Sequence, residues 1–296
     1  AGQADPMWAV LREIGELRKQ REQARGGISL PLPEQEIDVV DGRWSLAFRA
    51  RLAVEDWNEQ ISLLTGMAAA QRIVLARVRL LRTLPAPEPQ SLQRLHITAR
   101  ALGIDWPDGL SYPEFIRTLD PSKDTHVAML TACTTVLRGA GYTAFNGELP
   151  AQPMQWAVAA EYTHATAPLR RLVDRYTGEV CVALCAKQSV PDWALAALPG
   201  LPATMQASGH RAGQYQKAVL DLAEAAALAP RVGETFMGSI VEVAANAPTK
   251  GVVMVRDPAI EASVSSAADL PLGADVKVKL VEADPVKRTT RFELAG

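Results

Sequence analysis

The sequence predicts an α+β protein, with a long, mostly helical part that includes a short β segment, followed by a small five-stranded β-barrel of the OB type. Two observations support this. Apolar residues recur at helical spacing in Ala- and Leu-rich stretches over residues 1–230. Over residues 231–296, β-branched residues form short segments that Gly and Pro separate. We therefore expect one domain over 1–230 and a barrel domain over 231–296.

Length and composition are those of an ordinary globular protein. The 296 residues are 48% hydrophobic, enough for one good core and a second small domain. No apolar run approaches the roughly 18 residues of a membrane span, so no membrane partner is expected. Three cysteines are few and odd in number, which favours a reducing cytoplasm. The net charge of −2 argues against a positively charged coat but permits a local basic channel.

Residues 5–52 are expected to form a helix and a strand pair. Asp5-Pro6 can start a helix that runs to about Arg25, where Gly26-Gly27 ends it. After an extended segment, residues 37–40 and 44–52 are predicted strands around a tight turn at Asp41-Gly42.

Most of the next stretch is expected to be helical. A long helix with a wide apolar face is predicted over residues 55–82, before a proline-rich linker at 85–89. Shorter helices are predicted over 90–102, 112–119, 125–138, 191–198 and 206–229.

The stretch Tyr162–Tyr176 begins with polar residues and continues with features of a helix start. Thr166 or Ala167 stands where an N-cap belongs, and Pro168 where the first helical residue belongs. A helix is therefore predicted to begin there and to continue to about residue 186. Its free backbone N–H groups and the positive end of its dipole would form a site for a phosphate.

Charged side chains on this predicted helix are spaced for pairing. Arg170 and Asp174 are four residues apart and are expected to pair, while Arg171 and Arg175 are spaced to share an anion. The alternative is an ordinary, solvated helix start with basic residues.

The residues Tyr162-Thr-His-Ala-Thr-Ala-Pro-Leu-Arg170-Arg171, with Asp174 after them, resemble the signature of the ribonuclease II (RNB) family. Members of this family are magnesium-dependent, processive 3′-to-5′ exoribonucleases that degrade single-stranded RNA to nucleoside monophosphates. The resemblance implies that Arg170 is a catalytic residue that stabilises the scissile phosphate, with Arg171 as its neighbour. It implies RNA or phosphate contacts for the other polar residues of the stretch: Tyr162, His164, Thr166 and Arg175.

A second segment, Asn58-Glu59-Gln60-Ile61, resembles the RNB segment that contains a glutamate pair. Glu59 matches the second glutamate, and Asn58 replaces the first. The resemblance implies that Glu59 contacts the 2′-hydroxyl of bound RNA; a surface helix carboxylate is the alternative. The chain also departs from the family at Leu172 and at Gly178-Glu179, where a tyrosine and a His-Arg pair are usual.

The last part of the chain resembles the barrel with which RNB enzymes end, and which binds single-stranded RNA. Its strands are predicted over 236–243, 251–255, 260–264, 276–281 and 291–294. Its expected surface aromatics are few, Phe236 and Phe292 only, so base stacking should be weak. Positive charge for an electrostatic interaction comes from Lys277, Lys279, Lys287, Arg288 and Arg291.

The aspartates that hold magnesium in RNB enzymes have no counterpart in this chain, because no Asp-x-x-x-x-x-Asp-x-Asp-Asp run occurs. The resemblance covers the C-terminal part of the RNB catalytic domain, which is its mostly helical half, and the OB-type RNA-binding barrel. We therefore expect the Mg²⁺ ligands in an N-terminal half of the same protein, which would be a partner of this chain. The chain alone is expected to be inactive.

Two other functions remain open. The first is a non-catalytic RNA-binding or adaptor module derived from the family, which is favoured if the complete gene lacks the aspartates. The second is a helical interaction protein with a barrel tail and no nucleic acid. Low positive charge and few aromatics favour the latter, and the density of matches over 162–174 disfavours it.

Overall fold

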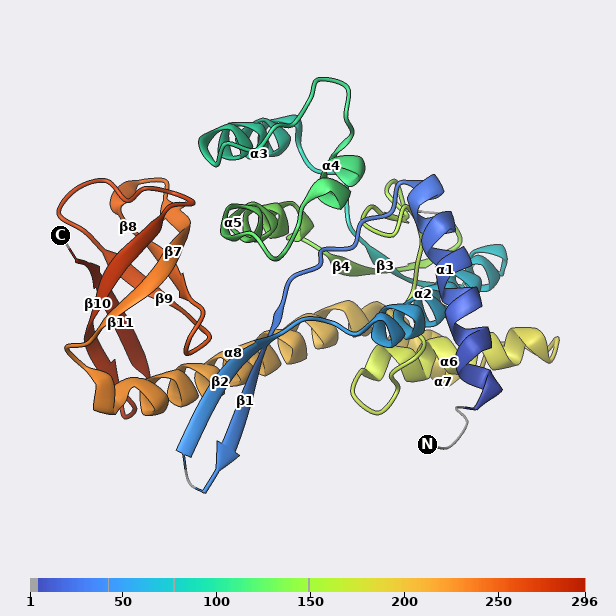
Figure 1. Cartoon of the computed structure of the whole chain (residues 1–296). Helices are drawn as coiled ribbons and strands as arrows, with labels where there is room; N and C mark the ends of the chain where they lie inside the picture. The colour runs from blue at the N-terminus through green and yellow to red at the C-terminus, as the bar shows by residue number, and fades with distance from the viewer. Residues whose placement is uncertain (1–4, 42, 77, 149, 296) are drawn as a thin grey trace. The chain divides into compact units, whose positions relative to one another are not determined.

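A computed structural model describes residues 5–41, 43–76, 78–148 and 150–295 (Figure 1). It confirms the α+β class, with helices and short strands followed by a closed five-stranded barrel. Contacts group the chain into two compact units. One contains the chain up to Ser29, Leu52–Pro87 and Leu137–Arg211; the other contains Leu30–Arg51, Glu88–Val136 and the chain from Ala212. The domain boundary expected at residues 230 and 231 stays a prediction.

The first unit contains helices and short strands. Its helices are α1 (Pro6–Arg25), α2 (Ala53–Leu75), α6 (Leu172–Cys185) and α7 (Asp192–Ala197), and α8 (Leu201–Leu228) begins there. Its strands are β3 (Val78–Thr83), β4 (Gly141–Asn146), β5 (Met154–Gln155) and β6 (Ala160–Glu161). Buried apolar side chains of α2, α6 and α7, such as Ile73, Val180 and Ala194, form one core cluster, and Leu80, Val173 and Leu198 form another.

Helix α1 confirms the predicted first helix and packs closely on α2. Asp5 caps it by accepting a hydrogen bond from the Met7 N–H at 2.8 Å. Gly26 ends it with φ of +81°. At Gly15, a Cβ would lie only 2.5 Å from the Cβ of Trp57, so glycine permits the close approach of the two helices.

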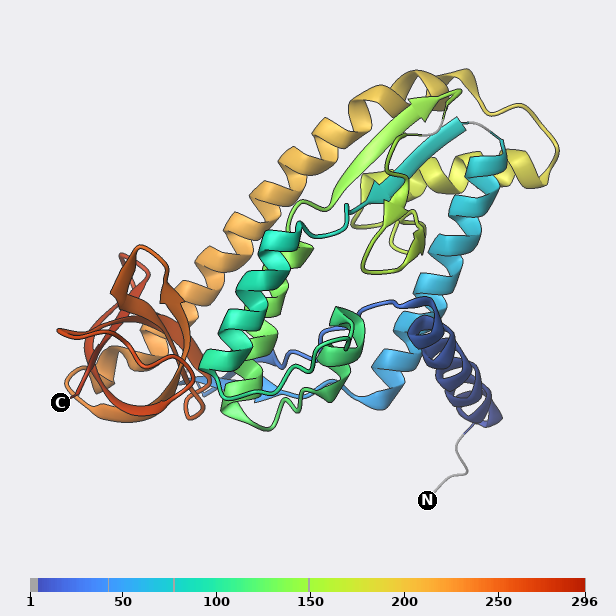
Figure 2. The same cartoon turned by 90° about the horizontal axis from the view of Figure 1, so that it is seen from above.

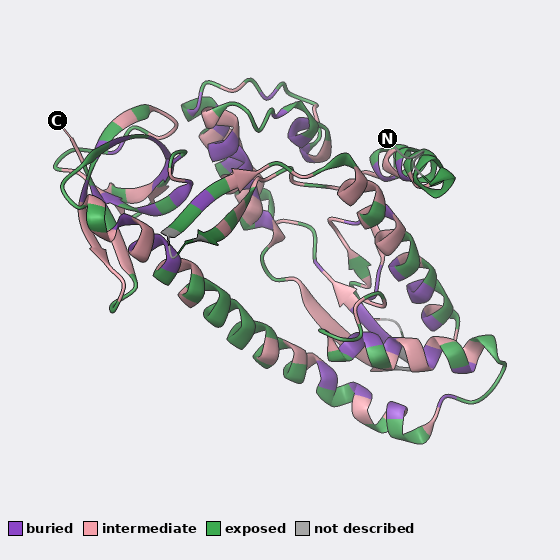
Figure 3. Cartoon of the chain, turned by 60° about the horizontal axis from the view of Figure 1, so that its bottom comes forward, coloured by how far each residue is buried: buried purple, intermediate pink, exposed green. Residues whose placement is uncertain are grey.

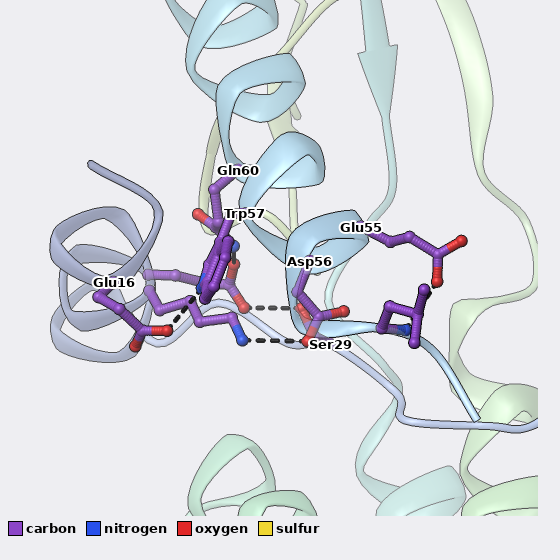
Figure 4. A network of polar contacts seen from close by, with 9 residues as sticks. Glu16, Ser29, Glu55, Asp56, Trp57 and Gln60 are labelled. Atoms are coloured by element: carbon purple, nitrogen blue, oxygen red, sulfur yellow. Dashed lines mark hydrogen bonds and ion pairs between the residues drawn. The ribbon is translucent and has the colours of Figure 1, made fainter. Parts of the chain in front are cut away.

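Polar contacts fix α1 on α2 where the two helices cross (Figure 4). The Trp57 indole N–H donates to Glu16 at 2.6 Å, and Lys19 lies 3.0 Å from Asp56. The Glu22 carboxylate accepts hydrogen bonds from Gln60 of α2 and from Ser29, just beyond α1. These bonds hold the C-terminal half of α1 in one position against α2.

The long helix predicted over 55–82 is wrong for residues 78–82, which belong to strand β3. Helix α2 ends at Leu75, and β3 pairs antiparallel with β4, from Leu80 opposite Ala144 to Thr83 opposite Gly141 (Figure 2). Residues 80 and 81 are both buried leucines, a local pattern that suits a buried helix as well as a strand. Pairing with a strand some sixty residues later decides the conformation, and no local pattern indicates such pairing.

The other predicted helices differ from the structure mainly at their ends. Helices α3 (Pro89–Ala101), α4 (Tyr112–Thr118) and α7 lie where expected. Helix α5 (Asp124–Cys133) is shorter than predicted, because residues 134–137 form a 3₁₀ turn. Helix α8 begins at Leu201 rather than at residue 206, and its middle turns are largely exposed (Figure 3).

The second unit contains the hairpin, α3, α4, α5 and the barrel. Strands β1 (Glu34–Val40) and β2 (Arg43–Arg49) confirm the predicted strand pair; of its turn residues, Gly42 lies outside the described part of the chain. The barrel comprises β7 (Thr235–Ala244), β8 (Ala247–Val255), β9 (Ile260–Ser265), β10 (Asp275–Asp284) and β11 (Thr289–Leu294). Parallel pairing of β9 with β11 and antiparallel pairing of the other neighbours close it.

The barrel core contains both of the aromatic residues of this region. Phe236 is 6% and Phe292 1% exposed, and their rings meet edge to face at 5.7 Å. The expectation that they are surface aromatics is therefore wrong, and neither ring is available to stack on a base. No described helix is both long and apolar enough to cross a membrane.

We predict that Phe292→Ala lowers the free energy of unfolding by about 3–5 kcal/mol, because it leaves a cavity in the barrel core. Urea denaturation followed by circular dichroism measures this change. Val286→Ala, at a 90% exposed barrel position, is the control and should change stability by less than about 0.5 kcal/mol. Equal stability of the two variants would contradict the assigned core.

Candidate functional site

The polar stretch that begins at Tyr162 forms a turn between β6 and α6. The prediction that a helix begins at residue 167 or 168 is wrong, because α6 begins at Leu172. The N–H groups of Arg170 and Arg171 both donate to the Ala167 carbonyl, at 3.2 and 3.0 Å. Residues 167–171 thus form a separate turn just before the helix.

Asp174 holds this turn in place. Its side chain is fully buried and accepts from the Ala167 N–H at 2.7 Å and from the Arg171 guanidinium at 2.8 and 2.9 Å. The predicted pairing of Arg170 with Asp174 is therefore wrong. The delayed helix start explains the difference, because it places residue 171, three positions before Asp174, at the N-cap.

The two neighbouring arginines consequently have different environments. The Arg171 side chain is 23% exposed and forms a bidentate ion pair with the buried carboxylate of Asp174. Arg170 is exposed, and its guanidinium makes no hydrogen bond or ion pair with the described part of the chain. Arg170 is thus the arginine of the turn that can take an external anion.

Behind the turn, Tyr162 and Thr163 attach the chain to α2 and β3. The Thr163 hydroxyl donates to the Leu80 carbonyl at 2.7 Å, and the Tyr162 carbonyl accepts from the Arg82 N–H at 2.8 Å. The Tyr162 ring lies against Gly66, where any Cβ would clash with it. The backbone before the turn is therefore rigidly supported.

His164 lies in a partly buried group with Tyr142 and Arg82. The Tyr142 hydroxyl and His164 Nδ1 are 2.6 Å apart, and the Arg82 guanidinium lies 4.7 Å from the centre of the Tyr142 ring. Burial, then the positive charges of Arg171 and Arg82 and, more weakly, of Arg170, lower the pKa of His164 to about 4. The imidazole is therefore neutral at pH 7 and can offer a ring N–H to a ligand.

Sequence reasoning gave Arg82 and Tyr142 no role in the site. They lie directly opposite each other in the β3–β4 pairing, and burial lowers the pKa of Arg82 and raises that of Tyr142. Because β3 was expected to be helical, this cross-strand pair could not be predicted. A correct prediction of both strands and of their register would have placed Arg82 opposite Tyr142.

The remaining predicted residues lie around this group. Glu59 is half-buried on α2. Burial is the main cause of the raised pKa of Tyr162, and the negative charge of Glu59 adds a smaller contribution in the same direction. Thr166 and Arg175 are exposed, on the turn and on α6 respectively. The structure thus brings Tyr162, His164, Arg170, Arg171 and Glu59 into one electrostatic neighbourhood. The side chains of Thr166 and Arg175 make no hydrogen bond or ion pair with these residues in the described part of the chain.

The site has the character of an anion site rather than a metal site. Three arginines, at 82, 170 and 171, act on His164, whereas the one buried carboxylate, Asp174, is already paired. No group of three or more potential metal-ligating His, Cys, Asp or Glu residues occurs in the part of the chain that the structure describes. The residues present therefore do not fit a resident Mg²⁺ ion.

The depressed pKa of His164 predicts a pH-dependent stability. The neutral form is favoured in the fold, so this contribution is complete above the unfolded pKa of 6.5 and is lost as pH falls through about 4. The stability advantage of wild type over His164→Gln should shrink by about 2 kcal/mol from pH 7 to pH 4, after discounting for partial exposure. Urea denaturation at several pH values tests this. An unchanged advantage would contradict the assignment, and exposed His210→Gln is the control.

Comparisons with known proteins point to one family. Residues 234–295 match the family model described as RNase II-type exonuclease C-terminal S1 domain. Comparison with curated protein sequences finds no match. Among solved structures, the apo form of Mycoplasma genitalium RNase R is similar, with 18% identity, a TM-score of 0.80, and coverage of 96% of this chain and 49% of that one.

Two further structures have the same fold over most of this chain. The Dss1 exoribonuclease of Candida glabrata matches with 10% identity and a TM-score of 0.71, over 97% of this chain and 35% of that one. Yeast Ssd1, described as a pseudonuclease, matches with 16% identity and a TM-score of 0.60, over 93% and 35%. This chain thus spans half or less of the length of these proteins. The resemblance to the RNB family is confirmed: the chain has the fold of about half of RNase R, and its residues 234–295 match the model of the RNase II-type C-terminal S1 domain.

Proposed function

We propose that this chain is the RNA-holding part of a 3′-to-5′ exoribonuclease that degrades single-stranded RNA to nucleoside monophosphates. The main supporting observation is the turn at Ala167–Arg171, which Asp174 locks while the Arg170 side chain stays exposed. The fold of the chain and its S1 domain agree with this function. M. genitalium RNase R, for comparison, has been solved with ribose-methylated single-stranded RNA.

In this proposal Arg170 binds the scissile phosphate and stabilises the negative charge that develops on it. Arg171 positions Arg170 by holding the turn through Asp174. His164, neutral at pH 7, donates a hydrogen bond to a phosphate or ribose oxygen from the ring nitrogen that does not face Tyr142. Glu59, Tyr162, Thr166 and Arg175 contact the RNA around the phosphate.

The barrel would contribute electrostatic contacts to the RNA backbone. Lys277 and Lys279 are exposed on β10 on either side of buried Val278, so both point outward. Lys287 and Arg291 are partly neutralised by ion pairs with Asp284 and Glu282. The two lysines of β10 are therefore the better candidates for phosphate contacts.

Hydrolysis itself requires groups beyond the residues described. We propose that an N-terminal half of the same cytoplasmic protein supplies the carboxylates for Mg²⁺, and that turnover depends on this metal. This chain would then hold the strand and the phosphate.

We predict that Arg170→Ala in the complete protein lowers turnover about 100- to 1,000-fold, in the range found for lost oxyanion donors. Thermal stability should stay nearly unchanged, because Arg170 is exposed. RNA affinity should change little, because Arg170 acts mainly on the charge that develops in the transition state and the other contacts hold the strand. Arg171→Ala is the contrasting variant, since it unpairs a buried carboxylate and should cost about 3 kcal/mol of stability. The assay measures nucleotide release from single-stranded RNA. Equal loss of binding and turnover in Arg170→Ala would exclude the proposed role.

The second candidate function is a non-catalytic RNA-binding or adaptor module. The similarity in fold to a pseudonuclease and the lack of a metal-ligand group among the described residues favour it. The intact mass and upstream sequence of the natural protein, followed by a Mg²⁺-dependent assay on single-stranded RNA, distinguish the two. RNA binding without Mg²⁺-dependent degradation would support the second.

A further inference from the structure

A groove of about 650 Å³ lies on the first unit, between α1, α2 and β6. This volume falls within the roughly 300–1,000 Å³ of typical small-ligand sites. We call it the arginine groove, and the lining residues that matter here are Arg18, Arg21, Arg25, Leu64, Gln71 and Glu161. It is separate from the turn at Arg170, although Glu161 directly precedes Tyr162 in the chain.

The arginine groove has an excess of positive charge and a deficit of hydrogen-bond acceptors. Three arginines face a single carboxylate there, that of Glu161. Arg25 donates through Nε to the Val158 carbonyl at 2.8 Å, but its buried Nη2 and the buried Nε of Arg18 have no hydrogen-bond partner among the residues that the structure describes. Buried N–H groups of this kind are rare in folded proteins and are costly for a charged group.

Arg18 and Arg25 also repel each other, and the nearby carboxylate of Glu22 offsets only part of this effect. Burial, and then the charge of Arg18, lower the pKa of Arg25. All three arginines of the groove lie on α1, so the helix itself keeps them together, and the bonds of Trp57, Asp56 and Gln60 fix that helix on α2 (Figure 4). An anion bound in the groove would reduce this repulsion and pair with the exposed parts of the guanidinium groups.

We propose that the arginine groove binds a backbone phosphate of single-stranded RNA, as a second anion site besides Arg170. A phosphodiester offers two charged oxygens that guanidinium groups can approach from different sides. Leu64 and the other apolar groups of α2 in the groove provide a surface for the attached nucleoside. This inference rests on the proposed RNA-binding function.

The test is binding of a labelled single-stranded RNA of roughly twelve nucleotides, measured by fluorescence anisotropy at several salt concentrations. Arg18→Gln and Arg21→Gln should each bind about tenfold more weakly. The slope of log affinity against log salt should fall by about 0.7 for each lost phosphate contact. Arg12→Gln, an exposed position on α1 outside the groove, is the matched control and should behave as wild type. Because Arg21 is exposed, its variant folds even if Arg18→Gln does not.

Two outcomes would overturn the inference alone. In the first, wild type binds RNA and both groove variants bind it equally well. In the second, a polyaspartate peptide binds wild type but not Arg18→Gln, while RNA affinity is the same in both; the groove would then be a site for an acidic protein segment. If wild type binds no RNA at all, the proposed function fails together with the inference.

Discussion

The buried carboxylate of Asp174 is the interaction on which the candidate site depends. It accepts a backbone N–H of the turn and two N–H groups of Arg171 at once, so its removal would leave a partly buried guanidinium without its partner and a turn without its hydrogen bond. Because Asp174 belongs to the first turn of α6, the helix and the turn are fixed relative to each other. The two adjacent arginines therefore differ in role: Arg171 holds the turn, and Arg170 is exposed. Spacing alone assigned the ion pair to the wrong arginine.

The sequence predicted the helices and the barrel well because these elements are local or strongly patterned. The Asp5 cap and Gly26 stop of α1, and the β-branched segments of the barrel, each determine their own conformation. Strands β3 and β4 could not be predicted, because each becomes a strand only by pairing with the other across a long stretch of chain. The start of α6 was misplaced for a related reason: a buried side chain at residue 174 decides how residues 167–171 fold.

The candidate site was predicted in part. The resemblance of the Tyr162 stretch to a family signature located the turn, and the structure places five of the predicted residues in one neighbourhood. The resemblance did not identify Arg82 and Tyr142, which lie on the two unpredicted strands and surround His164. Nor did it indicate that both barrel phenylalanines are buried, since a strand pattern does not by itself show which face turns inward. The roles of the site residues themselves remain proposals.

The parallel pairing of β9 with β11 has a consequence for how the barrel can meet a partner. In the described part of the chain each of the five strands pairs with two neighbours, so no strand has a whole free edge to which an extended chain could add as a sixth strand. We therefore expect the barrel to recognise a ligand mainly through side chains that project from its outer surface. Substitutions at outward-facing positions can therefore change the ligand preference of this barrel without changing the pairing of its strands.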